Sequence, residues 1–368
     1  MRSSRIAILH WPEPGAHSPV FPVFLPFSGC PVRCVFCAQE LQTGCAPRRV
    51  DAALDEAAHL LRERARGGLP APELAFYGGT FTAQPPEAYA ACLHFARTAL
   101  RQGLIAGLRC STRPDSLPPD RLAALREAGC ACVELGIQSF ADAPLRQSRR
   151  GYDGRTAREA CAAVRAAGMR PGVQLMPGMP GSRPEQFLED VRLALELGAV
   201  CLRFYPCLVL EGTKLAALWR AGRFRPWSLE TVLDVLAEGF TLAQRAGVPV
   251  IRMGLAPEAG LSGGVLAGPR HPALGARVQA RSLWRQVADV LAQARAGGHP
   301  AADAPVGLEL PRRLQGMYRG HAGELVPRWA ALGITDGRVR FHDGREEIRI
   351  VRLDGAAHDD AATPHEGF

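Results

Sequence analysis

The 368-residue sequence contains no asparagine and only one lysine, Lys214, so 43 of its 44 basic residues are arginine. Such a skew is typical of coding bias, and it weakens any inference that rests on the number of basic residues. The formal net charge of +8 therefore leaves two interpretations open. One is a nucleic-acid partner, and the other is an arginine-rich surface that is simply solvated.

Long apolar runs are also absent. No stretch approaches the roughly 20 consecutive apolar residues that span a bilayer. The N-terminal residues 1–9 contain few apolar side chains and are soon followed by His10 and Pro12, which does not match a secretory signal peptide. We therefore expect a cytoplasmic protein with no membrane partner.

The eleven cysteines form no recognisable disulfide framework, because their number is odd and their spacing uneven in a long chain. Reduced thiols and metal ligation in the cytoplasm fit this usage better. Hydrophobic residues make up 47% of the chain and charged residues 22%, which is ordinary for a globular protein. The length suggests two domains, or one barrel with an appendage.

Short β-like runs alternate with helical stretches from about residue 20 to 252. One predicted helix begins near Thr156, which resembles a capping box with Glu159. The alternation predicts parallel βα units with right-handed crossovers, in an open or partial barrel of six or seven units. The predicted strands cover residues 21–25, 74–77, 108–112, 132–137, 171–176, 201–205 and 248–251.

The pattern changes on both sides of this barrel, which we place at residues 20–255. Residues 1–19 are expected to form an N-terminal extension. Residues 256–353 are expected to form a small α+β extension, with a helix near residues 273–296 and a β-hairpin around Asp343-Gly344. Residues 354–368 are expected to be a disordered tail.

The most specific motif is C-x3-C-x2-C, made by Cys30, Cys34 and Cys37 directly after the first predicted strand. Three thiolates on one short loop can bind three irons of a [4Fe–4S] cluster. The fourth iron then stays open to chelate S-adenosylmethionine, and an electron from the cluster cleaves the sulfonium to a 5′-deoxyadenosyl radical. Phe36, just before the third cysteine, is expected to shield the cluster and to pack near the adenine.

A structural zinc site is the alternative for this loop. Zinc requires a closed tetrahedral shell, and Cys45 offers a fourth thiol eight residues after Cys37. No second cysteine knuckle follows at the distance usual for zinc sites, so we favour the cluster. The other cysteines fall in predicted helices or strands, where a free thiol is usually a small buried apolar group.

Unusual residues recur where the predicted strands end, which is where parallel barrels carry their chemistry. Two glycines after the second strand allow a backbone to approach a ligand closely, or else form a tight turn. Arg113 can pair with a bound carboxylate, or else brace its loop through Asp115. We predict cofactor binding at Phe36, Gly78, Gly79, Thr80, Thr112, Arg113, Glu134, Gly136, Gln138, Met176, Arg203 and Tyr205. No catalytic residue is assigned.

Together, the cysteine loop and the motifs at residues 77–80, 111–115, 134–139 and 176–181 resemble the radical S-adenosylmethionine superfamily. Residues 203–224 are similar to a segment of the branch that contains the catalytic subunit of Elongator. The resemblance covers about residues 20–255, and no acetyltransferase domain follows it.

The resemblance implies a partial (β/α)6 barrel, a [4Fe–4S] cluster, S-adenosylmethionine, and an electron donor such as flavodoxin or ferredoxin. In the Elongator relative it also implies modification of a tRNA uridine, which carries over here only as one candidate substrate. The alternative is an iron–sulfur protein that binds RNA or senses redox state without radical catalysis.

Overall fold

The computed structural model describes residues 4–12, 19–43, 49–255, 263–297, 305–344 and 346–353. The chain divides into two compact units. One contains residues 14–278, and the other combines residues 1–13 with residues 279–368. Each unit is described separately below. None of the helices among the described residues has the length and apolar content needed to cross a bilayer.

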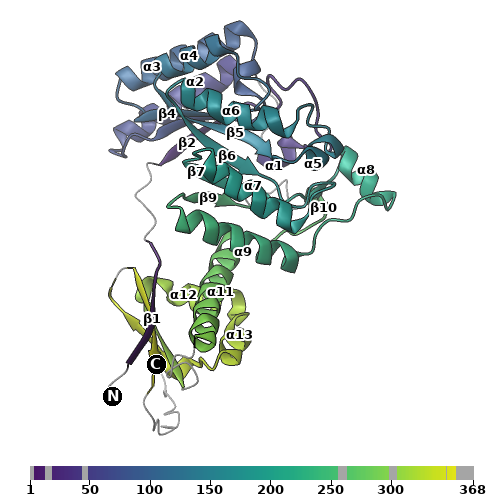
Figure 1. Cartoon of the computed structure of the whole chain (residues 1–368). Coiled ribbons are helices and arrows are strands. Elements are labelled where there is room, and N and C mark those ends of the chain that lie inside the picture. The colour runs from purple at the N-terminus through teal and green to yellow at the C-terminus, as the bar shows by residue number, and fades with distance from the viewer. Residues whose placement is uncertain are drawn as a thin grey trace. The chain divides into compact units, whose positions relative to one another are not determined.

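The larger unit contains a seven-stranded sheet whose strands follow one another in chain order, each parallel to its neighbours (Figure 1). This arrangement confirms the predicted α/β partial barrel, and each predicted strand overlaps an observed one. The strands are β2 (Val20–Phe24), β3 (Glu73–Tyr77), β4 (Gly107–Thr112), β5 (Cys130–Gln138), β6 (Arg170–Leu175), β7 (Cys201–Phe204) and β9 (Val250–Met253).

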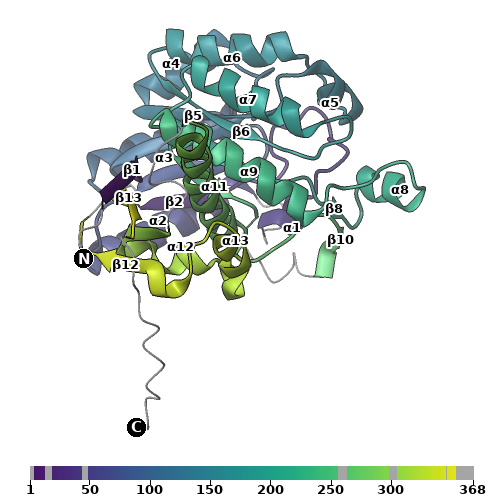
Figure 2. The same ribbon diagram turned by 60° about the horizontal axis from the view of Figure 1, so that its bottom comes forward.

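Helices connect these strands and cover the outer face of the sheet (Figures 1 and 2). Alternate strand residues on this face are fully buried and apolar, as Phe76, Leu135 and Phe204 illustrate, so burial against the helices fixes which face points outward. The connecting helices are α1 (Gln39–Thr43), α2 (Val50–Arg66), η1 (Phe81–Ala83), α3 (Pro86–Arg101), α4 (Pro119–Glu127), α5 (Asp142–Gln147), α6 (Gly154–Ala166), α7 (Pro184–Glu196), α8 (Lys214–Arg220) and α9 (Leu229–Arg245).

The inner face of the sheet is polar, and contacts across it show that the sheet curls. Arg203 on β7 donates a hydrogen bond of 2.5 Å from Nη2 to the hydroxyl of Tyr77 on β3. In a flat sheet these strands would be four spacings apart, about 19 Å. Side chains bridge such a gap readily only when the sheet bends toward itself, as a partial barrel does.

Local signals near the helix ends were less reliable than the strand pattern. The predicted capping box of Thr156 and Glu159 is wrong, because the helix begins earlier and Asp153 caps it. The Asp153 carboxylate accepts hydrogen bonds of 2.8 Å from the backbone N–H and the hydroxyl of Thr156. Outside the large sheet, β8 (Val209–Leu210) pairs antiparallel with β10 (Val265–Ala267).

The smaller unit is a four-stranded sheet in the order β1-β13-β11-β12. Tyr318 and Trp329, from its short helices, are buried beside Phe341 of the sheet. Its elements are β1 (Ser4–His10), β11 (Val306–Pro311), η2 (Arg312–Leu314), α12 (Gln315–Arg319), η3 (His321–Gly323), α13 (Val326–Ala331), η4 (Asp336–Arg338), β12 (Val339–His342) and β13 (Glu347–Arg352), while α11 (Leu274–Ala296) runs from the larger unit into this one.

Two expectations for the chain ends differ from this arrangement. The predicted hairpin is wrong, because β11 lies between β12 and β13 and pairs with both. Residues 4–10 were expected in a separate extension, but they pair with β13 as β1. Alternation along a strand identifies the strand but not its partner, which nonlocal contacts select. The predicted tail at 354–368 lies outside the described residues.

Candidate functional site

The cysteine loop follows β2 and lies against the carboxyl end of β3. The backbone N–H of Leu25 bonds the carbonyl of Tyr77 at 2.8 Å, and the N–H of Thr80 bonds the carbonyl of Ser28 at 2.7 Å. Two further bonds attach the loop elsewhere, from Val35 N–H to Ser148 and from the N–H of Leu215 to the carbonyl of Val35. The loop is therefore held by several separate segments.

The three thiols of the loop are close enough to influence one another electrostatically. Cys34 is buried, and Cys30 and Cys37 are half-buried. The pKa of Cys37 is raised to about 12, mainly by burial and then by the neighbouring Cys34 and Cys30, while Arg150 and Arg33 oppose the shift. A thiol in this environment loses its proton when a bound cation compensates the negative charge.

The sequence leaves two metal centres open for these thiols, an iron–sulfur cluster and a single zinc ion. Among the residues with described positions, no three Cys, His, Asp or Glu side chains converge on one ion site. A zinc site would bring its thiolates within about 2.3 Å of one ion, whereas each thiolate of an iron–sulfur cluster binds its own iron. Cys45, the fourth ligand of the zinc alternative, lies outside the described residues.

Gly78 and Gly79 hold the cysteine loop in place. Both have positive φ, +80° and +64°. A Cβ on Gly79 would lie 2.1 Å from the carbonyl oxygen of Ser28, and a Cβ on Gly78 would lie 3.2 Å from the backbone of Leu25. The close approach observed at this pair is made to the cysteine loop, whereas the predicted one was to a bound ligand.

Gln39 on α1 also stabilises the junction between the cysteine loop and the end of β3. This role of Gln39 was not predicted. Its Oε1 accepts a hydrogen bond of 3.0 Å from the N–H of Gly79 and another from the N–H of Phe27. In the sequence, the one indication of this role was the position of Gln39 just after the third cysteine of the motif. Thr80, which was predicted, lies with its hydroxyl 3.3 Å from the sulfur of Cys30.

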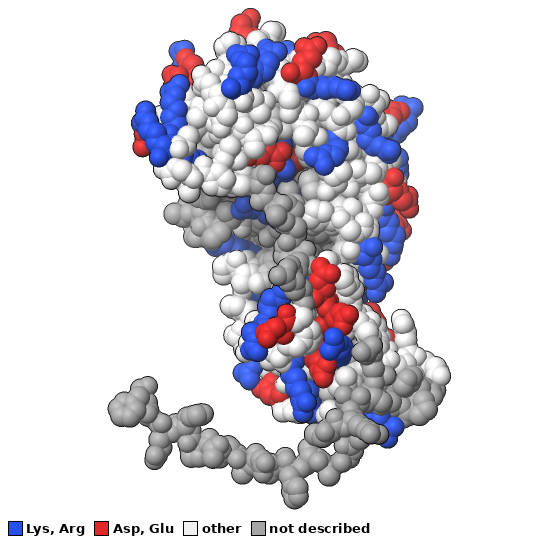
Figure 3. All heavy atoms as spheres, turned by 90° about the vertical axis from the view of Figure 1, so that its left-hand side faces the viewer, with Lys and Arg blue, Asp and Glu red and all other residues white. Residues whose placement is uncertain are grey.

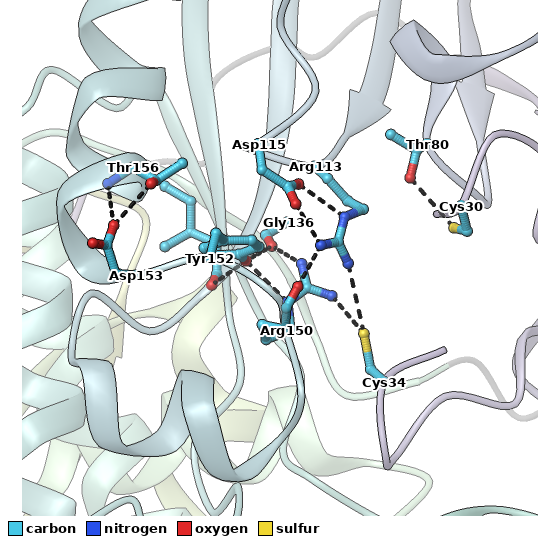
Figure 4. A network of polar contacts seen from close by, with 11 residues as sticks. Cys30, Cys34, Thr80, Arg113, Asp115, Gly136, Arg150, Tyr152, Asp153 and Thr156 are labelled. Atoms are coloured by element: carbon cyan, nitrogen blue, oxygen red, sulfur yellow. Dashed lines mark hydrogen bonds and ion pairs between the residues drawn. The ribbon is translucent and has the colours of Figure 1, made fainter. Parts of the chain in front are cut away.

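Arg113 and Arg150 converge on the sulfur of Cys34 (Figure 4). Nη1 of Arg150 is 3.0 Å from this sulfur and Nη1 of Arg113 is 3.8 Å from it. Arg113 also makes a two-pronged bond to Asp115, at 2.9 and 2.7 Å, so the predicted loop brace is present as well. Arg150 was missed, since its burial depends on how the segment after α5 folds back.

A second group of charged residues lies on the inner face of the sheet. The buried carboxylate of Glu134 accepts hydrogen bonds from the hydroxyl of Tyr77 at 2.7 Å, from Arg109 at 3.1 Å and from Arg203 at 3.1 Å. Arg203 also bonds the hydroxyl of Tyr205 at 3.1 Å. Burial, followed by the charge of Glu134, raises the pKa of Tyr77, which therefore stays protonated.

The end of β5 is shaped by Gln138, whose φ of +69° is rare outside glycine. Its carbonyl accepts a bond of 2.9 Å from the N–H of Met176, and its Oε1 accepts one of 3.0 Å from Gln174. The next two residues are held by Asp190 on α7, which accepts bonds from the hydroxyl of Ser139 at 2.7 Å and from the N–H of Phe140 at 2.9 Å.

The remaining predicted residues divide into two sets. Phe36 and Met176 pack with Cys34 in one apolar cluster beside the cysteine loop. The carbonyl of Gly136 accepts bonds from Arg150 and Tyr152. Thr112 lies apart from this group, on the outer face, where its hydroxyl is 2.6 Å from that of Thr82. Its buried position reflects packing beneath η1.

The donor set therefore fits an iron–sulfur cluster. One loop carries three thiols, an apolar cluster shields one of them, and two guanidinium groups face its sulfur. The seven other cysteines with described positions are buried, as expected for small apolar side chains: Cys92, Cys110, Cys130, Cys132, Cys161, Cys201 and Cys207.

Comparison with protein families gives two matches. The model of the radical SAM superfamily matches residues 24–194, and that of the Radical_SAM C-terminal domain matches residues 199–283. Together the matched segments cover the cysteine loop and six of the seven strands of the large sheet, β3 to β7 and β9. They also account for well over half of the chain.

Curated relatives match over a shorter region. The tRNA uridine(34) acetyltransferase of Methanocaldococcus infernus is 31% identical over 129 residues, which is 34% of this chain and 24% of the relative. Elongator complex protein 3 of Saccharomyces cerevisiae is 31% identical over 134 residues, again 24% of its length. The matched part thus spans about a quarter of each relative.

A solved structure of Elp3 from the same archaeon, lacking its N-terminus, superposes with a TM-score of 0.54 at 21% identity. The superposition covers 77% of this chain and 64% of that one. The likeness at this identity concerns the fold, and it supports the partial barrel described above.

The contact between Gly79 and Ser28 predicts a large effect of Gly79→Ala. The new Cβ meets backbone that cannot move without displacing the cysteine loop, so we expect a loss of at least ~2 kcal/mol in the free energy of unfolding, beyond the ~1 kcal/mol cost of positive φ. The control is Gly103→Ala, at φ +68° with nothing within 4 Å of the added Cβ. Equal losses in urea unfolding would contradict the docking role.

Asp190 predicts a pH dependence of stability. Burial raises its pKa from 3.8 to about 6. The folded protein therefore binds more protons than the unfolded chain between about pH 4 and 6, and stability falls as pH rises through that window. Relative to Asp190→Asn, wild type should lose up to ~3 kcal/mol from pH 4 to 7.

Urea unfolding at several pH values measures this loss. Glu196→Gln, an exposed change on the same helix, serves as the control and should track wild type throughout. A constant difference between wild type and Asp190→Asn across the window would show that Asp190 does not titrate there.

Proposed function

The chain belongs to the radical S-adenosylmethionine superfamily, and we propose that Cys30, Cys34 and Cys37 bind its [4Fe–4S] cluster. When bound, the cluster supplies the electron that cleaves S-adenosylmethionine to a 5′-deoxyadenosyl radical. The observation that carries this assignment is the set of three thiols on one loop, docked at the carboxyl ends of the parallel strands. This is the edge where barrels of this kind place their chemistry.

We further propose that S-adenosylmethionine binds against the carboxyl ends of β3 to β7. Phe36 and Met176 exclude water beside Cys34. Glu134 is held by ion pairs with Arg109 and Arg203, so it offers a fixed acceptor on the inner face. The proposed contacts are the predicted ones other than Thr112: Gly78, Gly79, Thr80, Arg113, Gly136, Gln138, Arg203 and Tyr205, with Phe36, Met176 and Glu134 above.

Family membership favours radical catalysis over the alternative of an iron–sulfur protein that only binds RNA or senses redox state. Catalysis of this kind needs a one-electron donor, for which we propose a flavodoxin or ferredoxin.

A tRNA is the substrate that we propose. The support is twofold: the Methanocaldococcus infernus relative above is named for a tRNA uridine, and the segment after β8 is basic. Residues 211–225 contain Lys214, Arg220, Arg223 and Arg225 as exposed cations against one acid, Glu211, which pairs with Arg220 at 2.6 Å.

The face drawn in Figure 3 shows no such concentration of one charge. On the face drawn in Figure 3, acidic and basic side chains are interspersed over the described residues, without a continuous basic area. The basic segment 211–225 is therefore a more specific feature than the net charge of +8.

Replacement of a cluster ligand tests the enzymatic proposal. Anaerobically reconstituted wild type should be brown and form 5′-deoxyadenosine with dithionite, while Cys34→Ala should lose most of its iron and fall to background turnover. The control is Cys92→Ala, which removes a buried thiol on α3 and should keep both iron and turnover. A colourless, zinc-loaded wild type, or full turnover by Cys34→Ala, would disprove the assignment.

Filter binding of tRNA tests the substrate. Binding should weaken roughly 10- to 100-fold from 50 to 200 mM salt if about three phosphates are neutralised. Combined replacement of Lys214, Arg223 and Arg225 by Gln should weaken binding and reduce the salt slope. The same change at Arg62, Arg66 and Arg101, exposed on α2 and α3, is the control.

No binding by wild type at low salt would rule out tRNA as the substrate. Nucleoside mass spectrometry of a deletion strain would identify the modified base.

A further inference from the structure

Cys34 differs from the other two thiols of the loop in its surroundings. It is only 7% exposed, and two guanidinium groups face its sulfur, Arg150 at 3.0 Å and Arg113 at 3.8 Å (Figure 4). Cys30 has instead a neutral hydroxyl, that of Thr80, at 3.3 Å. The loop is thus asymmetric: Cys34 has guanidinium nitrogens in contact with its sulfur, whereas Cys37 is influenced by Arg150 and Arg33 without a described contact to either.

The positive charge around Cys34 exceeds the negative charge of the nearby carboxylates. Arg113 and Arg150 are 4% and 5% exposed. Asp115 pairs with Arg113, but among the described residues no carboxylate pairs with Arg150. A buried cation without a counter-charge is costly, and the thiolate of Cys34 is the group placed to supply that charge.

Arg150 is also fixed in orientation by groups that do not move with the cysteine loop. Its Nε donates to the hydroxyl of Tyr152 at 2.9 Å, and its Nη2 donates to the carbonyl of Gly136 at 2.5 Å. Tyr152 in turn donates to the carbonyls of Gly136 and Ile137 on β5, at 2.9 and 3.0 Å. Arg113 bonds the backbone carbonyl of Arg150. The guanidinium is therefore held against β5 and pointed at Cys34.

We propose that Arg150 is a positioning residue that donates a charged hydrogen bond to the sulfur of Cys34 and thereby raises the reduction potential of the cluster. Arg113, whose guanidinium also faces this sulfur, adds a second positive charge beside it. The proposal rests on the cluster assignment above. Its physical basis is that hydrogen bonds to ligand sulfurs and local positive charge both favour the more negative, reduced state of an iron–sulfur cluster. The one-electron donor then delivers its electron more readily.

A redox titration followed by electron paramagnetic resonance tests this role in the full-length, reconstituted protein. Arg150→Met should shift the midpoint potential to more negative values than in wild type. Arg150→Lys, which keeps the charge but loses the planar fork, should lie between them. Tyr152→Phe, which removes the hydroxyl that orients Arg150, should shift the potential in the same direction by less.

The matched control is Arg146→Met, which removes an exposed arginine on α5 in the same stretch of chain and should leave the potential unchanged. Iron and sulfide content and thermal unfolding of the apoprotein are measured for every variant, so that misfolded protein is recognised. If Arg150→Met takes up no cluster, the midpoint potentials of Arg150→Lys and Tyr152→Phe decide whether the proposal holds.

A cluster of unchanged potential in Arg150→Met would overturn the proposal. So would unchanged potentials in both other variants when Arg150→Met fails to load. Failure of the cluster assignment itself is seen separately, because wild type would then hold no iron–sulfur cluster or form no 5′-deoxyadenosine.

Discussion

The backbone contact between the cysteine loop and the end of β3 is the constraint on which the site depends. Gly79 reaches a positive φ and has no Cβ, and so the carbonyl of Ser28 can approach it far more closely than any other residue would allow. Once the loop is seated, Gln39 bonds both sides of the junction. The loop that carries the three thiols is then fixed at the carboxyl end of β3.

The sheet itself separates two environments. Apolar side chains on the outer face are buried by the helices, which supplies the main stabilisation of the barrel. The inner face carries Arg109 and Arg203, whose charges are compensated by the carboxylates of Glu73 and Glu134. A polar interior of this kind is costly for stability alone, and it is stable here because each charge has a partner. It also offers fixed donors and acceptors at the strand ends where the cofactor is proposed to bind.

The predicted site residues do not all lie on one face of the sheet. Glu134 lies on the inner face with Arg109 and Arg203. Thr112, which also stands at a strand end, points outward to Thr82, because adjacent strand residues face opposite sides. Arg150 and Asp190 were not predicted. One follows a short helix and the other lies within a longer one, and nothing in their neighbours indicates that their side chains are buried beside Cys34 or the end of β5.

The sequence by itself determined the order of strands, the βα repetition and the cysteine motif, since these depend on local periodicity and on residues a few positions apart. Tertiary structure alone decided which strands pair in the smaller unit, where β11 separates β12 from β13. It also decided which charges meet, as when Arg150 reaches a sulfur 116 residues away in the chain. Such contacts depend on the path of the whole backbone, and the conformational preferences of neighbouring residues do not determine that path.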